Sequence, residues 1–272
     1  MLIVDLYNGV RHIGFKLIFW LYMIINLAAF IICVNGDFDT HYQFIRAADE
    51  NFFLMGTETS FLLYIFMILF PITSCIIASH SLSTDFCSGR TISQCQRCGI
   101  SKYISSKLIS NIILTFLCSI IPLLINLLLC HIVYPSVGYD SEWAETRYNI
   151  GELSYDNARF LDMFRLEHAT FYNIIHVLIV GIFAVLISVL ALGISIFIKE
   201  RPVLCFLLPI ILSLTLIVIR VVLDNTSRGD FFMYNYLSPN SYGSVGKFIL
   251  LIICWTIVDG VILHHGRKCF ER

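Results

Sequence analysis

Three closely spaced cysteines form the first group in the sequence that could do chemistry. Cys95 and Cys98 are separated by two residues, and Cys87 precedes them. A Cys-x-x-Cys pair can supply two zinc ligands or cycle between dithiol and disulfide. A structural zinc site needs four ligands, and only His80 lies near these cysteines in the sequence. The pattern therefore favours cysteines that pack against a partner protein, and we expect no metal on this chain.

A second chemically distinctive residue is Asp259, which stands beside Gly260 in the last long apolar segment. A charge within the hydrocarbon layer of a membrane is costly unless it is paired or hydrated. Asp259 could therefore face a translocation path or a contact between subunits. It could equally form a structural hydrogen bond to a neighbouring Ser, Asn or Tyr side chain, and the sequence leaves both interpretations open.

The chain carries no nucleotide-binding motif. Residues 241–248, SYGSVGKF, approach a Walker A loop, but the first glycine is missing from its required place and Phe248 replaces Ser or Thr. A serine-hydrolase elbow and an H-E-x-x-H zinc motif are also absent. We therefore expect no cofactor on this chain and no enzymatic activity of its own, and nothing in the sequence indicates nucleic-acid binding.

The elements that would position these residues are long and apolar. Of the 272 residues, 58% are hydrophobic and 14% are charged, whereas soluble proteins carry about 25% charged residues. A membrane-spanning helix needs roughly 20 largely apolar residues. We predict an all-α integral membrane protein, with residues 1–272 forming a single transmembrane domain of six spans, at about 13–35, 60–80, 107–132, 171–198, 202–223 and 247–266.

Charge is distributed unevenly between the polar segments. With six spans, both chain ends share one side with loops 81–106 and 199–201. These segments, with the first residues of the adjoining spans, carry 11 Lys/Arg and 4 Asp/Glu, whereas the segments on the other side carry 7 and 14. Basic residues collect on the cytoplasmic side of membranes. We therefore predict cytoplasmic termini and extracellular segments 36–59 and 133–170.

The N-terminal residues 2–13 are amphipathic. Asp5, Asn8, Gly9 and His12 recur at helical spacing, and apolar residues cover the opposite face. Such a helix lies flat in the membrane interface. The alternative is that these residues simply extend the first span.

The loop 81–106 is the largest predicted cytoplasmic segment. Its pattern predicts two short helices around a glycine turn, the first capped by Ser83, Thr84 or Asp85 and the second by Ser101. A folded, basic loop with few bulky aliphatic residues suits a rigid surface for another protein. The residues that would form this surface are Asp85, Gly89, Arg90, Thr91, Gly99, Ile100, Ser101 and Lys102.

This loop resembles that of the type-2 ABC exporter permeases, the membrane subunits of ATP-binding cassette exporters. In that family an acid precedes a Gly-Thr-like pair, a Pro-x-Ser/Thr-Arg/Lys turn follows, and a lysine opens the third span. Here Asp85 stands for the usual glutamate, and residues 89–91 match with one extra residue. Gly99 replaces the proline, whereas residues 101 and 102 and Lys107 match.

The likeness extends over the rest of the chain. The six-span plan, the amphipathic start, the tight turn KERP at 199–202 and the Ser238-Pro239 pair before the last span are similar to the family pattern. The long segment 133–170 departs from the shortest members. The resemblance implies a bacterial cell-membrane protein that forms the translocation path and pairs with a second permease copy or a homologous permease. It further implies a separate ATPase subunit, which binds ATP and Mg and docks on the coupling helix within 81–106.

Other functions fit the sequence less well. An intramembrane enzyme would need a catalytic pair, for which His176 and Asp259 are the strongest candidates. A non-transporting immunity or sensor protein that binds a toxic peptide outside the cell would share the same fold. The cargo of an exporter cannot be read from the sequence. It could be a drug or a peptide, and the 14 acids against 7 bases outside favour a cationic amphipathic peptide.

Overall fold

The computed structural model describes residues 1–41, 45–55, 58–87, 89–136, 160–197, 207, 211, 232–239 and 243–271. Within these ranges the backbone forms helices, turns and irregular segments, with no strand, which confirms the all-α prediction. The helices, in chain order, are α1 (Leu2–Arg11), α2 (Ile13–Asp37), α3 (Ser60–Cys87), α4 (Arg90–Cys98), α5 (Ile100–Val133), α6 (Asp162–Glu167), α7 (Ala169–Phe197), α9 (Tyr234–Leu237) and α10 (Val245–Glu271).

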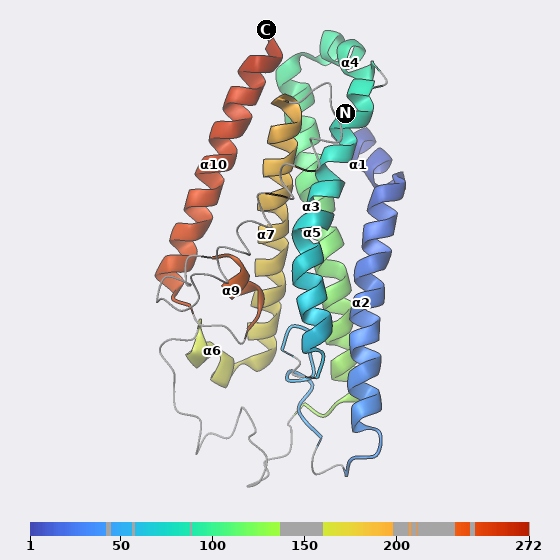
Figure 1. Ribbon diagram of the computed structural model, residues 1–272, viewed down its shortest axis with the longest axis vertical. Helices are drawn as coiled ribbons and strands as arrows, with labels where there is room; N and C mark the ends of the chain where they lie inside the picture. The colour runs from blue at the N-terminus through green and yellow to red at the C-terminus, as the bar shows by residue number, and fades with distance from the viewer. Residues whose placement is uncertain are drawn as a thin grey trace.

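Among the described residues, five helices are long and apolar enough to cross a membrane: α2, α5 and α7, the Ser60–Ile77 part of α3, and the Val245–Lys268 part of α10. They run alongside one another in one bundle (Figure 1). The chain thus has the character of a multi-pass membrane protein, as predicted. The predicted span 202–223 lies outside the described residues, apart from Leu207 and Ile211, so the count of six remains a prediction.

Both chain ends lie at the same end of the bundle, and α4 lies there too (Figure 1). Helices α7 and α10 run in the same direction, toward this end. The six-span plan requires this of its fourth and sixth spans. We call this the α4 end of the bundle and its opposite the far end.

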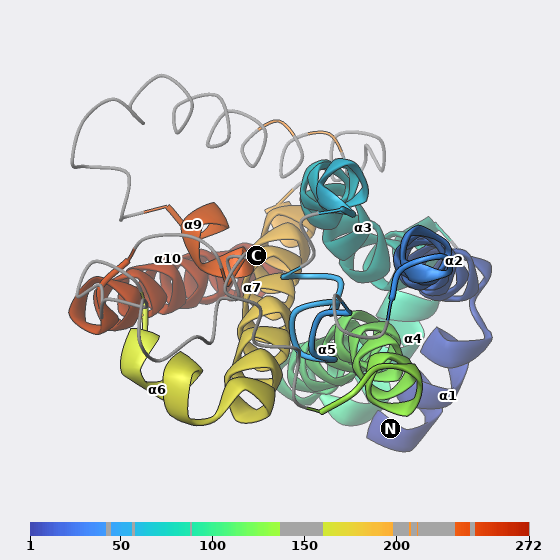
Figure 2. The same ribbon diagram turned by 90° about the horizontal axis from the view of Figure 1, so that it is seen from below.

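Helix α7 forms the centre of the bundle (Figure 2). In the most apolar stretch of α7, 78% of the residues are buried, whereas in that of α10 only 11% are buried. Gly181 allows α5 to approach α7 closely, because a Cβ at this position would lie 2.6 Å from the Ile120 side chain. Bulky apolar residues from the other helices then pack around α7.

The segment 45–55 folds into the bundle at the far end, although sequence analysis assigned 36–59 to an extracellular loop. Figure 2 shows this segment close to α3, α5 and α7. Its residues 52–55 are completely or almost completely buried. The backbone N–H of Phe53 donates to Asn126 Oδ1 at 3.1 Å, and Asn126 Nδ2 donates to the Asn26 carbonyl at 2.8 Å. Residues 47–55 of the predicted loop are therefore buried against the bundle.

The predicted loop 81–106 is mostly helical. Helix α3 continues to Cys87 and α5 begins at Ile100, so α4 alone lies between them. The second short helix that was expected after the glycine turn is the first part of α5. At the far end, α6 lies within the predicted extracellular segment 133–170, of which residues 137–159 lie outside the described part of the chain.

We predict that Phe53→Ala lowers the free energy of unfolding by about 3–5 kcal/mol, because it leaves a cavity in a packed core. Phe61→Ala provides a matched control, since the Phe61 side chain is 73% exposed on α3. Thermal unfolding of both variants in mild detergent measures the difference. Equal stability of the two variants would show that 45–55 is not packed in the core.

Candidate functional site

Two glycines delimit α4, the helix that connects α3 to α5. Gly89 precedes α4 with φ 68° and ψ 3°, and Gly99 follows it with φ 80° and ψ 145°. Positive φ angles are tolerated by glycine and strained for other residues. Both positions belong to the predicted surface. Their conformations reverse the chain out of α3 and back into α5, as the expected glycine turn requires.

The remaining predicted surface residues divide between two faces. Arg90 and Lys102 are exposed, Ile100 and Ser101 are half-buried, and Thr91 is buried. Other exposed residues extend the open face of α4: Ser93, Gln96, Arg97 and Cys98. The helix therefore presents a polar, basic face outward, at the end of the bundle that carries both termini (Figure 1).

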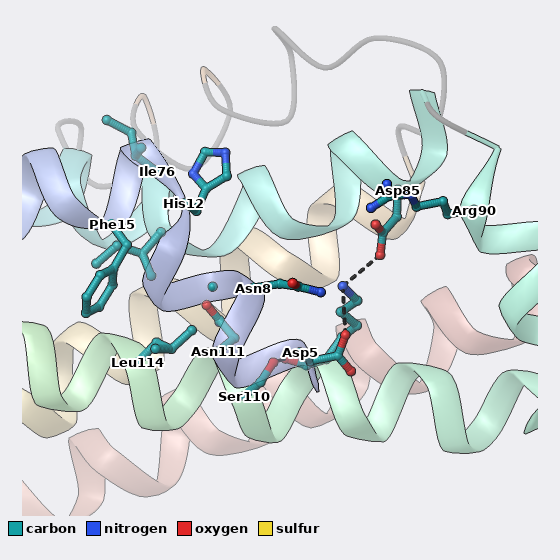
Figure 3. A pocket seen from close by; sticks show the side chains of 13 residues that line it. Asp5, Asn8, His12, Phe15, Ile76, Asp85, Arg90, Ser110, Asn111 and Leu114 are labelled. Carbon is teal, nitrogen blue, oxygen red and sulfur yellow. Dashed lines mark hydrogen bonds and ion pairs between the residues drawn. The ribbon is translucent and has the colours of Figure 1, made fainter. Parts of the chain in front are cut away.

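The buried side of this region is organised by Lys107. Its Nζ lies 2.7 Å from Asp85 Oδ2 and 3.2 Å from Asp5 Oδ1 (Figure 3). The Tyr103 hydroxyl donates to Asp85 Oδ2 at 3.0 Å, and the Ser106 hydroxyl donates to Asp5 Oδ2 at 2.6 Å. We call Asp5, Asp85 and Lys107 the charge triad. All three are at most 8% exposed, so the triad joins α1, α3 and α5 through buried ion pairs.

Helix α1 turns its polar face toward the protein, whereas an amphipathic helix on a soluble protein turns its apolar face inward. Its polar face packs on α5, where Asp5 is buried and Gly9 lies against the Leu114 side chain. The apolar face points away from the described protein, with Ile3 80% exposed and with Val4, Tyr7 and Val10 also exposed. This arrangement suits a helix whose outer face meets lipid. The helix is present as predicted, and its interfacial position remains a prediction.

Sequence analysis missed the charge triad. Asp5 was assigned to the polar face of the N-terminal helix. Asp85 was assigned to the docking surface and was one of three possible helix caps, but it is buried. Instead, Gly89 and Gly99 occupy the N-cap positions of α4 and α5, without a side-chain cap. The sequence did contain a signal for the triad. Lys107 lies where the apolar sequence of its span begins, and Asp5 and Asp85 are predicted to lie at the same membrane depth.

Asp259 lies on α10 and is 5% exposed. Neither carboxylate oxygen has a hydrogen-bond partner among the described residues. A structural hydrogen bond to Ser, Asn or Tyr, one of the two interpretations of the sequence, is therefore not found in that part of the chain. The alternative role in a path or subunit contact remains a hypothesis.

Two cysteines of this region, Cys95 and Cys98, have described side chains. The described residues contain no group of three or more His, Cys, Asp or Glu side chains that could hold a metal ion. Cys98 is exposed and Cys95 is half-buried. Burial, with a smaller contribution from Cys98, raises the pKa of the Cys95 thiol, which keeps it protonated and weakly reactive.

Comparison with known proteins finds no matching family model, no significantly similar curated protein and no significantly similar solved structure. The assignment of function therefore depends on the geometry described above and on the sequence pattern.

We predict that Lys107→Met lowers the free energy of unfolding by about 3–5 kcal/mol, because it leaves two buried carboxylates without their common cation. The triple variant Asp5→Asn, Asp85→Asn, Lys107→Met should recover most of this loss, since no buried charge remains. Lys102→Met is the control: Lys102 is exposed, and its substitution should change stability by about 0.5 kcal/mol or less. Equal unfolding of Lys107→Met and Lys102→Met would contradict an ion-paired triad.

Proposed function

We propose that this chain is the permease subunit of an ABC exporter. In this proposal it lies in a bacterial cell membrane with both termini in the cytoplasm and pairs with a second copy or a homologous permease. A separate ATPase subunit binds ATP and Mg and docks on α4. The cargo would be a peptide or a drug, and the acidic outer segments favour a cationic peptide.

The observation that carries the proposal is the form of α4. It is a separate nine-residue helix held between two positive-φ glycines, and its outer face is polar and basic. The loop motif that resembles the exporter permeases runs from Asp85 to Lys107 and includes α4. A short, rigid, exposed helix at the end of a membrane bundle suits a docking site better than a flexible loop would, because less conformational entropy is lost on binding.

The charge triad supports a role of α4 in transmitting motion. Asp85 lies two residues before the end of α3 and is bound to Lys107 on α5 and, through that lysine, to Asp5 on α1. A displacement of α4 would act on the helices at both of its ends. Because the pairs are buried and short, these helices should move together rather than slide past one another.

An intramembrane enzyme receives no support from the described geometry. His176 Nδ1 faces the Tyr236 carbonyl oxygen at 3.2 Å, and its ring packs against the rings of Phe160 and Tyr172. No hydrogen bond joins His176 to Asp259 in the described part of the chain. An immunity or sensor protein would share this architecture, so the presence of a bound ATPase is the discriminating measurement.

We predict that a second subunit co-purifies with the tagged chain from its native membranes. This subunit should carry a nucleotide-binding motif and hydrolyse ATP. Arg97→Glu should weaken this association at least about tenfold, because it reverses an exposed charge on the basic face. Arg11→Glu is the matched control, since Arg11 is also exposed but lies on α1. The retained ATPase activity per permease measures the outcome.

Two results would contradict the proposal. The first is a purified chain with no associated ATPase, even after cross-linking in the membrane. The second is equal loss of the ATPase in the Arg97→Glu and Arg11→Glu variants. The Lys107→Met variant provides a further comparison, because it should retain docking through α4 while losing stability.

A further inference from the structure

A cavity of about 300 Å³ lies beside the charge triad, lined by α1, the beginning of α2, the end of α3, the first residue of α4 and the first part of α5. Figure 3 shows the side chains around it. Its volume is at the lower end of the range of small-molecule sites, roughly 300–1,000 Å³. The role proposed above for α4 does not account for this cavity, which lies inside one subunit.

The lining of the cavity changes in polarity along the helix axes. On α5, Lys107 is followed by Ser110 and Asn111 and then by Leu114. The other elements show the same order, from Asp5 through Asn8 and His12 to Phe15, and from Asp85 back to Ile77 and Ile76. Charged groups therefore lie at the α4 end, amide groups lie in the middle, and apolar groups lie toward the centre of the bundle.

An unsatisfied acceptor belongs to Asn111, one of the residues that line the middle of the cavity. Asn111 is 3% exposed, and its Nδ2 donates to the Ser188 hydroxyl at 2.5 Å. Its Oδ1 has no hydrogen-bond partner in the described part of the chain. A buried polar atom without a partner is costly, so a ligand that donates a hydrogen bond here would remove that cost.

The buried charge beside the cavity favours a cationic donor. The buried triad contains two carboxylates and one ammonium group, so it carries a formal charge of −1. Arg90, the other cation of the lining, is exposed at the edge of the cavity. An ammonium group has three N–H donors and no acceptor. It would match both the Asp5 carboxylate and Asn111 Oδ1.

We propose that this cavity binds an amphiphile that carries a primary amine, with the amine near Asp5 and Asn111. The apolar part lies along Phe15, Ile76 and Leu114 and extends toward the hydrocarbon layer. Phosphatidylethanolamine of the adjoining leaflet and free amphipathic amines share this chemistry. The proposal does not depend on the chain being a permease.

The test measures binding to the purified full-length chain by native mass spectrometry. The lipid probes are dioleoyl-phosphatidylethanolamine, its choline analogue without N–H donors, and dioleoyl-phosphatidylglycerol. The free probes are dodecylamine and dodecyltrimethylammonium. We expect each primary amine to bind at least about tenfold more tightly than its trimethylated analogue, because charge-assisted hydrogen bonds are lost in the analogue.

Matched variants locate the binding. Ile76→Trp fills the apolar part of the cavity and should weaken binding of the primary amines at least about tenfold. Ile109→Trp makes the same change on α5 at a side chain that is 43% exposed and does not line the cavity, and it should alter affinity by about twofold or less. Asn111→Leu should weaken binding as well. If loss of the Ser188 contact prevents this variant from folding, Ile76→Trp still decides the outcome.

The outcomes separate the sources of the amine. Binding of the phosphatidylethanolamine alone identifies a lipid site, binding of dodecylamine alone identifies a site for free amphiphiles, and binding of both supports a shared site. Equal binding of amine and trimethylated probes would overturn the proposal. So would tightest binding of phosphatidylglycerol, which would indicate phosphate recognition, or unchanged binding by Ile76→Trp.

Discussion

The α4 end of this molecule depends on one buried ammonium group. Lys107 cannot be buried without anionic partners, because an unpaired charge in an apolar environment is far too costly. Its partners, Asp5 and Asp85, come from two different helices. The chain can satisfy Lys107 only if α1 lies on α5 and α3 remains helical beyond the apolar part of its span. That requirement sets where α3 ends and therefore where α4 begins.

The same requirement explains the orientation of α1. A helix with one polar and one apolar face would turn its apolar face inward on a soluble protein. Here Asp5 and Gly9 face α5 while Ile3 and its apolar neighbours face outward. Beside a lipid layer the outward apolar face costs nothing, since lipid replaces the protein core. The inward polar face gains ion pairs and a hydrogen bond from Ser106.

The apolar spans could be predicted from the sequence because hydrocarbon thickness fixes their length. The predicted 171–198 is helix α7 (Ala169–Phe197), and 247–266 lies within α10. The glycine turn at Gly99 also followed from residue type. Polar extensions of helices could not be predicted in this way. The residues around Lys102 belong to α5, but their hydropathy is too low to mark them as part of a span. The burial of 47–55 was hidden for a related reason, since the charged Asp49 and Glu50 interrupt its apolar residues. In the structure, Thr170 and Asn173 donate hydrogen bonds to the Asp49 carboxylate.

Tertiary contacts make α5 the element that connects the two ends of the bundle. At the α4 end it carries Lys107, and in the middle Asn111 and Thr115 meet the Ser188 hydroxyl of α7. At the far end Asn126 holds the inserted segment, and His131 Nε2 lies 3.4 Å from Asp49 Oδ1. A helix of 34 residues is about 51 Å long at 1.5 Å per residue. Polar contacts at three levels along such a helix oppose independent sliding of its neighbours. If α4 receives force from a docked ATPase, as proposed, α5 is the helix through which that force would reach the far end.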